Sequence, residues 1–247
     1  MTSAQEDFWA FLRAATPARI ALGRTGDSLP TRRVLDFQLA HEQARDAVHA
    51  ELDADALGEE LSAWTPAIVH SEAADRTSFL QRPDLGRALS PHSAKALIPG
   101  NYDVTIVIAD GLSAAAAQTL APTVCRMLLA QDFVFAPPVV AVQARVALGD
   151  EIAVAQGARM VVMLIGERPG LSACRSLGAY VTFDPRPGVT TDAGRNCVSN
   201  IRPGGLSAEE ASSRILAIMR LAQTIKATGT RLKEDAALAL TAPQNIS

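Results

Sequence analysis

The chain has 247 residues, enough for one large domain or two small ones. Hydrophobic residues make up 48% of it and aromatic residues only 4%, so alanine, leucine and valine must build the core. The net charge of −3 argues against the basic surface that nucleic-acid binding normally needs. No apolar run approaches the roughly 18 residues of a membrane span.

The N-terminus and the cysteines both indicate a cytoplasmic protein. Residues 1–7 are polar and acidic, without the basic and apolar regions of a signal peptide. Cys125, Cys174 and Cys197 are odd in number and far apart, which favours reduced thiols over a disulfide framework. No CxxC or paired histidine spacing indicates zinc, so we expect no metal site formed by this chain.

The first hundred residues are predicted to be mainly helical. An amphipathic helix is expected within residues 5–16, and a turn-rich stretch follows from Gly23 to Thr31. Thr31 is a candidate cap for a long helix from Arg32 to Leu52, which has an apolar stripe and a charged face. Shorter elements follow in this order: a helix at Asp55–Trp64, an extended piece at Ile68–Val69, a loop at Arg82–Arg87 and a short helix before Pro99.

After Gly100 strands and helices alternate. The expected order is strand Val104–Ile108, helix Ser113–Ala130, strand Val139–Ala144, helix Asp150–Gln156, strand Val161–Ile165, helix Leu171–Leu177, strand Tyr180–Phe183 and a helix from Ser207 to about Ala227. Such alternation predicts an α/β fold, with a Rossmann-like parallel sheet flanked by helices. We therefore divide the chain into a smaller helical N-terminal part, residues 1–100, and an α/β domain, residues 101–247. From Thr228 we expect a loosely ordered tail, in which Leu232–Leu240 can add a turn or two of helix.

The first candidate ligand contact follows the most apolar strand. Met160–Ile165 is a continuous apolar run, typical of a strand buried on both faces of a sheet. The chain then turns through Gly166–Gly170, and loops at the carboxyl ends of parallel strands hold ligands. Glu167 in this turn is either a ligand contact or an idle, solvated carboxylate. A later long loop is expected to carry Asp192, Arg195, Asn196, Cys197, Ser199 and Asn200.

Other polar residues also admit two interpretations. Asp110 ends a strand and serves either the turn or a ligand, whereas Ser113 is interpreted as a helix cap. A nucleophilic Cys197 needs an activating base, but all four histidines lie within the first 92 residues, so a partly buried, packed thiol is favoured. A solvated helix face or a protein interface accounts for three nearby arginines, namely Arg24, Arg32 and Arg33.

Several cofactor and catalytic motifs are absent. The chain contains neither GxGxxG nor GxxxxGK[ST], and no GxSxG nucleophile turn. No histidine stands in the Asp-x-His-x-x-Gly sequence of proteins that replace the lower ligand of cobalamin with histidine. A nucleotide-binding enzyme and a serine hydrolase are therefore disfavoured.

Stretches from about Ile20 to Ile225, in this order and at these spacings, resemble the small (light) subunit of ethanolamine ammonia-lyase, an adenosylcobalamin-dependent enzyme. The matching stretches are Gly23–Gly26, Leu35–Val48, Arg82–Arg87, Asp110–Ser113, Gly166–Leu171, Cys197–Ile201 and Gly204–Gly205. The resemblance implies radical deamination of ethanolamine to acetaldehyde and ammonia. It also implies that the substrate site lies on a large subunit, a TIM barrel, with both chains in equal numbers in a higher hetero-oligomer.

The same resemblance implies the cofactor contacts. Three family positions assigned to cobalamin map onto Val146, Glu167 and Cys197, all of which follow predicted strands. A base-on cofactor, which keeps its own dimethylbenzimidazole on cobalt, is consistent with the missing histidine motif. No catalytic residue is expected on this chain, and its helical N-terminal part is expected to contact the large subunit.

Two segments of the chain differ from the family pattern. The longer N-terminal extension that some family members use for packaging into a bacterial microcompartment is nearly absent, so a cytoplasmic location is favoured over that compartment. The tail beyond Thr228 has no clear counterpart and receives no function. The alternative is a non-catalytic cytosolic α/β binding or scaffolding protein.

Overall fold

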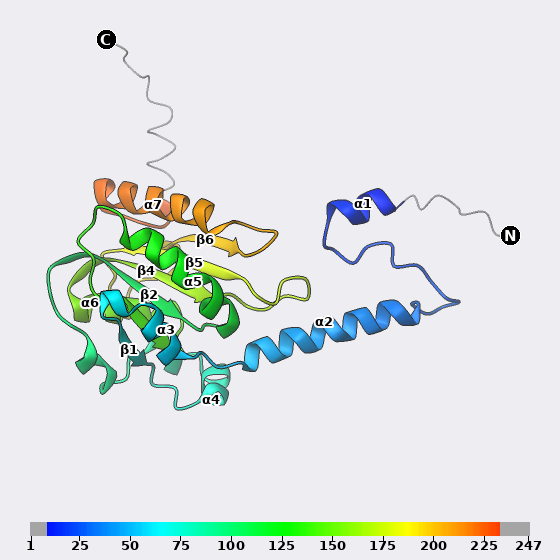
Figure 1. The fold of residues 1–247 in the computed structure, drawn as a ribbon, viewed down its shortest axis with the longest axis horizontal. Helices are drawn as coiled ribbons and strands as arrows, with labels where there is room; N and C mark the ends of the chain where they lie inside the picture. The colour runs from blue at the N-terminus through cyan, green and yellow to red at the C-terminus, as the bar shows by residue number, and fades with distance from the viewer. Residues whose placement is uncertain (1–8, 233–247) are drawn as a thin grey trace, which may run out of the picture.

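In the computed structural model, which describes residues 9–232, a six-stranded sheet has the strand order β1-β3-β2-β4-β5-β6 (Figure 1). The strands are β1 (Ala67–His70), β2 (Tyr102–Ala109), β3 (Val139–Val142), β4 (Ala158–Gly166), β5 (Leu177–Phe183) and β6 (Asn196–Ile201). The helices are α1 (Ala10–Ala15), α2 (Thr31–His49), α3 (Ala54–Glu60), α4 (Arg76–Gln81), α5 (Ala114–Leu129), α6 (Leu148–Gln156) and α7 (Ala208–Ile225). Short 3-10 turns lie at Ser62–Trp64, Leu85–Arg87, Ser93–Ala96 and Asp192–Gly194.

The α/β class is confirmed, but the sheet is mixed rather than wholly parallel. Strands β1, β3, β2 and β4 are parallel, whereas β5 runs antiparallel to β4, and β6 antiparallel to β5. The predicted helix Leu171–Leu177 is wrong, because residues 167–176 form an irregular turn closed by a bridge between Gly170 and Ala173. A parallel neighbour needs a crossover connection, and without this helix the chain turns back antiparallel.

Strand β6 occupies part of the long loop that the sequence predicted. Its polar residues hide the strand pattern, because Asn196, Ser199 and Asn200 are poor strand formers. Val198 faces the core opposite Ala179 of β5, while Cys197 pairs with Tyr180 on the other face. Cys197 therefore belongs to a sheet and not to a free loop.

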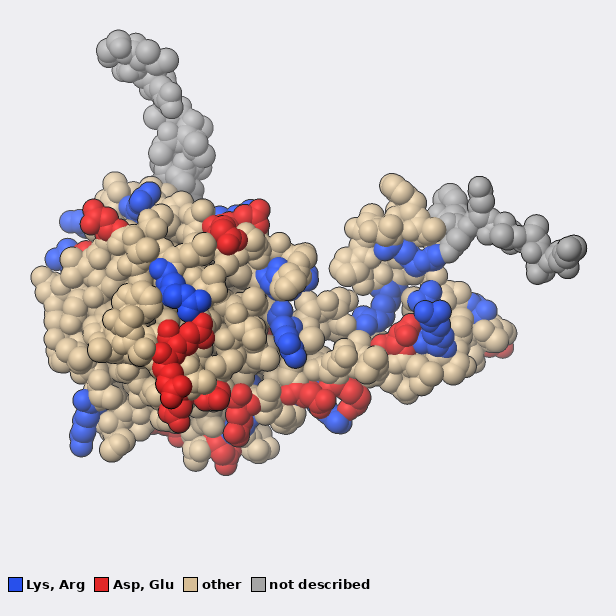
Figure 2. Space-filling view, viewed as in Figure 1, with Lys and Arg blue, Asp and Glu red and all other residues tan. Residues whose placement is uncertain are grey.

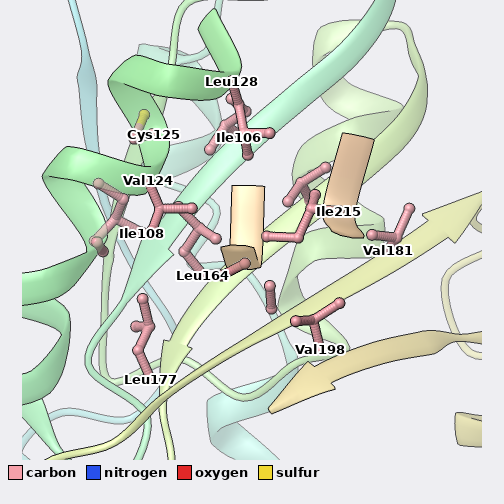
Figure 3. Packing of buried hydrophobic residues seen from close by; sticks show 14 of the residues in the cluster. Ile106, Ile108, Val124, Cys125, Leu128, Leu164, Leu177, Val181, Val198 and Ile215 are labelled. Atoms are coloured by element: carbon pink, nitrogen blue, oxygen red, sulfur yellow. The ribbon is translucent and has the colours of Figure 1, made fainter. Parts of the chain in front are cut away.

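One face of the sheet carries the larger core, formed with α3, α5 and α7. Figure 3 shows Val124 and Leu128 of α5 beside Ile108 and Ile106 of β2, with Ile215 of α7 farther along the same face. Each fully buried aliphatic side chain of this kind contributes about 1.5–3 kcal/mol. Helix α7 begins with a capping box in which Ser207 and Glu210 satisfy each other's backbone amides.

The opposite face is covered only in part. Helix α6 packs against β2 and β4 through a second core that includes Leu148, Ile152 and Met163. Beyond α6, the face of β5 and β6 stays open where Tyr180 is half-buried and Cys197 is exposed. This uncovered face lies beside the carboxyl ends of the parallel strands.

Helices α1 and α2 form an N-terminal arm, residues 9–49, that projects from the body (Figure 1). Neither helix buries a residue, although the arm exposes large apolar side chains, among them Trp9, Phe11, Leu12, Leu35, Phe37 and Leu39. The predicted long helix is confirmed, but Pro30 rather than Thr31 precedes its first turn and no side chain caps it. Figure 2 shows basic side chains, all of them arginine, spread along this arm.

The residues just after α7 are anchored, contrary to the loose tail predicted from Thr228. The Thr228 hydroxyl accepts a hydrogen bond from the Phe183 amide (2.9 Å) and donates one to the Gly194 carbonyl (2.7 Å). Gly229 exchanges two hydrogen bonds with the Asn196 side chain. Most of the predicted Leu232–Leu240 helix lies outside the described residues. Within residues 9–232, no helix has both the length and the apolarity to cross a membrane.

Candidate functional site

The carboxyl ends of β2, β3 and β4 open into three adjoining hollows. The Glu167 hollow, about 460 Å³, is lined by residues that include Val146, Glu167 and Tyr180. The Asp192 hollow, about 410 Å³, lies toward the 190–195 turn, and the α2 hollow, about 730 Å³, lies under the end of the arm. Arg145 lines all three. The adjacent strands β2 and β3 are followed by helices on opposite faces of the sheet. Open α/β sheets bind ligands at the carboxyl ends of two strands that diverge in this way.

Asp110 fixes the loop that carries Val146. Its carboxylate accepts hydrogen bonds from the backbone amides of Gln143 and Ala144, both at 2.9 Å, and from Nη1 of Arg76 at 2.9 Å. Gln143 has φ +56°, a left-handed conformation that these bonds hold in place. The alternatives for Asp110 are thus resolved toward structure, because its oxygens serve the protein.

Burial dominates the electrostatics of this pair. Desolvation raises the pKa of Asp110, while the backbone amides and the charge of Arg76 oppose the shift. Burial likewise lowers the pKa of Arg76, against the attraction of Asp110. Arg76 also donates through Nε to the Val48 carbonyl near the end of α2 (2.8 Å), so the pair joins the arm to the Val146 loop.

Glu167 is held by one carboxylate oxygen. Its Oε2 accepts from the Ser176 hydroxyl (2.5 Å) and from the Asn200 amide (3.3 Å). Within residues 9–232, Oε1 accepts no hydrogen bond. A Cβ added to Gly178 would lie 3.1 Å from Oε1, so the absence of a side chain at Gly178 leaves the space that the Glu167 carboxylate occupies. Glu167 therefore presents one unused acceptor at its hollow.

The turn before Glu167 packs directly on the turn after β2. A Cβ on Gly166 would lie 2.1 Å from the Ser113 carbonyl oxygen, and one on Gly111 would lie 2.3 Å from the Gly166 carbonyl oxygen. Ser113 occupies the predicted N-cap position of α5, but its side chain makes no capping bond, because its hydroxyl donates to the Cys174 carbonyl (3.1 Å). These contacts fix the two loops relative to each other.

Cys197 lies beside the Glu167 hollow rather than in its lining. It pairs across β5–β6 with Tyr180. Burial, followed by the electrostatic influence of the neighbouring Cys197, raises the pKa of Tyr180 to about 12. Although Cys197 is exposed overall, partial desolvation of its thiol raises the pKa of Cys197, which opposes thiolate formation and a nucleophilic role. Sequence reasoning did not identify Tyr180 as a site residue, because it assigned Tyr180 only to a strand and could not show that this strand borders the hollow.

A second group that sequence reasoning missed is cationic. Arg145 stacks on the buried ring of Phe79 at 4.2 Å, and the exposed Arg168 lies across the same hollow. The 190–195 turn is held by a buried ion pair in which Arg195 donates to both carboxylate oxygens of Asp150 (2.7 and 2.6 Å). Among residues 9–232, no three His, Cys, Asp or Glu side chains gather as a metal site would require.

Comparison with known proteins assigns the family. The model of the family described as Ethanolamine ammonia-lyase light chain (EutC) matches residues 6–233. An ethanolamine ammonia-lyase small subunit of Pseudomonas fluorescens (strain Pf0-1) is 53% identical over 241 residues, covering 92% of this chain and 87% of that protein. Small subunits of Ralstonia nicotianae and Rhodopseudomonas palustris (strain BisA53) are 50% and 51% identical, covering 94% and 96% of this chain and 90% and 94% of theirs. The chain therefore belongs to the ethanolamine ammonia-lyase light-chain family and is a small subunit of that class of ammonia-lyase.

Proposed function

We propose that this chain, with a large subunit, binds adenosylcobalamin and supports the deamination of ethanolamine to acetaldehyde and ammonia. The observation that carries the proposal is that Val146 and Glu167 line one hollow, with the cross-strand pair Tyr180 and Cys197 at its side. The three family positions thus lie around one surface, although they come from different strands and loops. The relatives named above support the substrate and the reaction through their names.

The residues present fit the chemistry of a corrin, a broad apolar ring with amide groups around its rim. Val146 offers an aliphatic contact, and the free Oε1 of Glu167 offers an acceptor to a rim amide. The uncovered face of β5 and β6 gives a flat ligand room beside Tyr180 and Cys197. Among the described residues no histidine lines the Glu167 hollow, which favours a cofactor that keeps its own dimethylbenzimidazole on cobalt.

The work of this chain is then to bind, orient and exclude water. Adenosylcobalamin, when bound, supplies the radical chemistry. Asp110 keeps the Val146 loop fixed, while Ser176 and the Asn200 amide keep the Glu167 carboxylate in one orientation. Tyr180 and Cys197 stay protonated at neutral pH, because burial raises the pKa of both groups. We assign no catalytic residue to this chain and place the substrate on the large subunit, a TIM barrel.

The projecting arm is the surface that we assign to the large subunit, in an assembly with equal numbers of both chains. Its exposed Trp9, Phe11 and Phe37 are the aromatic type that protein interfaces favour, and Arg24, Arg32 and Arg33 add the favoured cation. We also propose the cytoplasm as its location. This assignment retains the proposed division into a helical N-terminal part, residues 1–100, and an α/β domain from residue 101.

The test is reconstitution of the purified chain with a large subunit from the same family. We expect the two chains to co-elute, to bind cobalamin together and to deaminate ethanolamine, while the small chain alone shows no turnover. A small chain that ignores the large subunit, or a complex that binds no cobalamin, would favour the alternative of a non-catalytic scaffolding protein. Turnover by the single chain would contradict the division of labour.

A further inference from the structure

Five arginines line the adjoining hollows. Arg45 and Arg195 have carboxylate partners in Glu42 and Asp150, and the other three are Arg87, Arg145 and Arg168. Arg145 lines all three hollows, Arg168 lines the Glu167 and α2 hollows, and Arg87 lines the Asp192 hollow. They are close enough to repel one another: after burial itself, the charges of Arg76, Arg87 and Arg168 lower the pKa of Arg145. The hollows therefore share a concentration of positive charge.

Within residues 9–232 no carboxylate pairs directly with these three arginines, although the charge of Asp110 acts on Arg145 and partly offsets the repulsion. Arg76 has a carboxylate partner, Asp110, whereas within residues 9–232 no carboxylate oxygen lies within 4.0 Å of Arg87, Arg145 or Arg168. The two carboxylates that line the same hollows do not pair with these three arginines. Glu167 accepts from Ser176 and Asn200, and Asp192 is fully exposed with one oxygen 3.9 Å from Nε of Arg195. The three arginines are thus available to an external anion.

Arg145 is also held in a fixed orientation. Its guanidinium stacks on Phe79 at 4.2 Å and donates through Nη2 to the Phe79 carbonyl at 3.3 Å. Its backbone amide donates to the Gly86 carbonyl at 2.7 Å, and its buried Nε has no hydrogen-bond partner among the described residues. A cation fixed before the ligand arrives loses less side-chain entropy on binding. Arg145 also immediately precedes Val146, the expected corrin contact.

We propose that Arg87, Arg145 and Arg168 form an anion-binding subsite for the phosphodiester in the nucleotide loop of cobalamin. This inference rests on the proposed function. Cobalamin carries one phosphodiester, which joins a side chain of the corrin to the dimethylbenzimidazole nucleotide. Guanidinium groups bind phosphate oxygens through charge-assisted and often bidentate hydrogen bonds. A subsite beside Val146 fixes the cofactor by its rim and by its tail at once.

The experiment compares two ligands on the reconstituted complex: cyanocobalamin, and dicyanocobinamide, which lacks the phosphodiester and the nucleotide. The variants are Arg168→Gln and Arg87→Gln, because both side chains are exposed and make no hydrogen bond within residues 9–232 that the fold would lose. Binding is followed by absorbance titration. Arg186→Gln is the matched control, since that exposed arginine pairs with Asp184 on its own loop, outside the hollows.

We expect each variant to weaken cyanocobalamin binding about tenfold, equivalent to about 1.4 kcal/mol, and to leave dicyanocobinamide binding unchanged. Raising the ionic strength should weaken cyanocobalamin binding by the wild-type complex more than by Arg168→Gln, because salt screens the charge that the variant lacks. The control should match wild type throughout. Cyanocobalamin binding that neither variant alters, or an equal loss for both ligands, overturns the subsite alone. A wild-type complex that binds no cyanocobalamin overturns the proposed function as well.

Discussion

The substitution Glu167→Gln tests the acceptor at the centre of the site. The native carboxylate uses Oε2 for Ser176 (2.5 Å) and the Asn200 amide (3.3 Å), which leaves Oε1 for the ligand. A glutamine has one acceptor oxygen. If that oxygen replaces Oε2, an NH₂ group stands where a corrin amide would donate; if it replaces Oε1, the NH₂ group faces the Ser176 hydroxyl and the Asn200 amide.

The magnitude follows from these bonds. A hydrogen bond to a charged group contributes about 1.5–3 kcal/mol, against about 0.5–1.5 kcal/mol for a neutral one. Loss of the ligand bond should therefore weaken cobalamin binding by about tenfold to a hundredfold, at 1.4 kcal/mol per tenfold. Weakening of the two bonds at Oε2 should cost about 1 kcal/mol of unfolding free energy, a fall of about 2–4 °C in Tm for a chain of this size.

The assay is cyanocobalamin titration of the reconstituted complex, with a parallel thermal melt of the small subunit alone. Ser176→Ala is the companion variant, because it removes the clamp on Oε2 while keeping the carboxylate, and its affinity loss should be the smaller of the two. Glu60→Gln is the control, since Glu60 pairs with Arg126 on an exposed surface outside the hollows. Unchanged cofactor affinity together with a collapsed melting temperature would refute a ligand contact at Glu167.

Three further predictions concern the supports of the site. Asp150→Asn breaks the buried pair with Arg195 and should cost about 3–5 kcal/mol, measured by denaturant unfolding; a loss below 1 kcal/mol would contradict this role. Gly166→Ala places a Cβ 2.1 Å from a backbone carbonyl and should prevent normal folding, whereas Gly170→Ala, with its nearest atom at 3.8 Å, should leave the circular dichroism melt unchanged. Because desolvation raises the pKa of Cys197, iodoacetamide should alkylate this thiol more slowly at pH 8 than it alkylates free cysteine, and the alkylation rate should rise with pH. Bound cyanocobalamin should protect Cys197 from alkylation. Rapid, pH-independent alkylation would refute this prediction.

The sequence predicted the parts of the fold whose pattern is decided locally. Apart from the exposed Arg159 near its start, strand β4 is apolar and buried on both faces, so its apolar run was sufficient evidence. Helix α7 was equally clear, because Ser207 and Glu210 form a capping box ahead of an amphipathic stretch. In these segments local preference and tertiary packing favour the same structure.

The misassigned segments depend on distant partners. Residues 171–176 lack a helix because the Ser113 hydroxyl and the Glu167 amide bind the Cys174 and Ser176 carbonyls, which the local sequence does not encode. Strand β6 exists through pairing with β5 and through the bonds between Asn196 and Gly229. Tertiary hydrogen bonds decided both cases over local propensity.

The candidate site shows the same division. Glu167 was predicted from its position after β4, and that position at the carboxyl edge is confirmed. Its fixed orientation was not predictable, because it depends on Ser176, Asn200 and the absence of a side chain at Gly178. The assignment of cobalamin contacts to Val146, Glu167 and Cys197 rests on the family resemblance and stays a prediction.

The ion pair Arg76–Asp110 connects the arm with the loop that carries Val146. Arg76 donates to the Val48 carbonyl at the end of α2 and to the carboxylate of Asp110, and that carboxylate in turn holds the amides of Gln143 and Ala144 ahead of Val146. All of these bonds lie between 2.8 and 2.9 Å, and the two charged side chains are almost fully buried. A rotation of the arm that broke the bond at Val48 would leave Arg76 short of a buried partner. Under the proposed assignments, the surface for the large subunit and the loop for the corrin belong to one hydrogen-bonded unit, so we expect docking of the partner to affect placement of the cofactor.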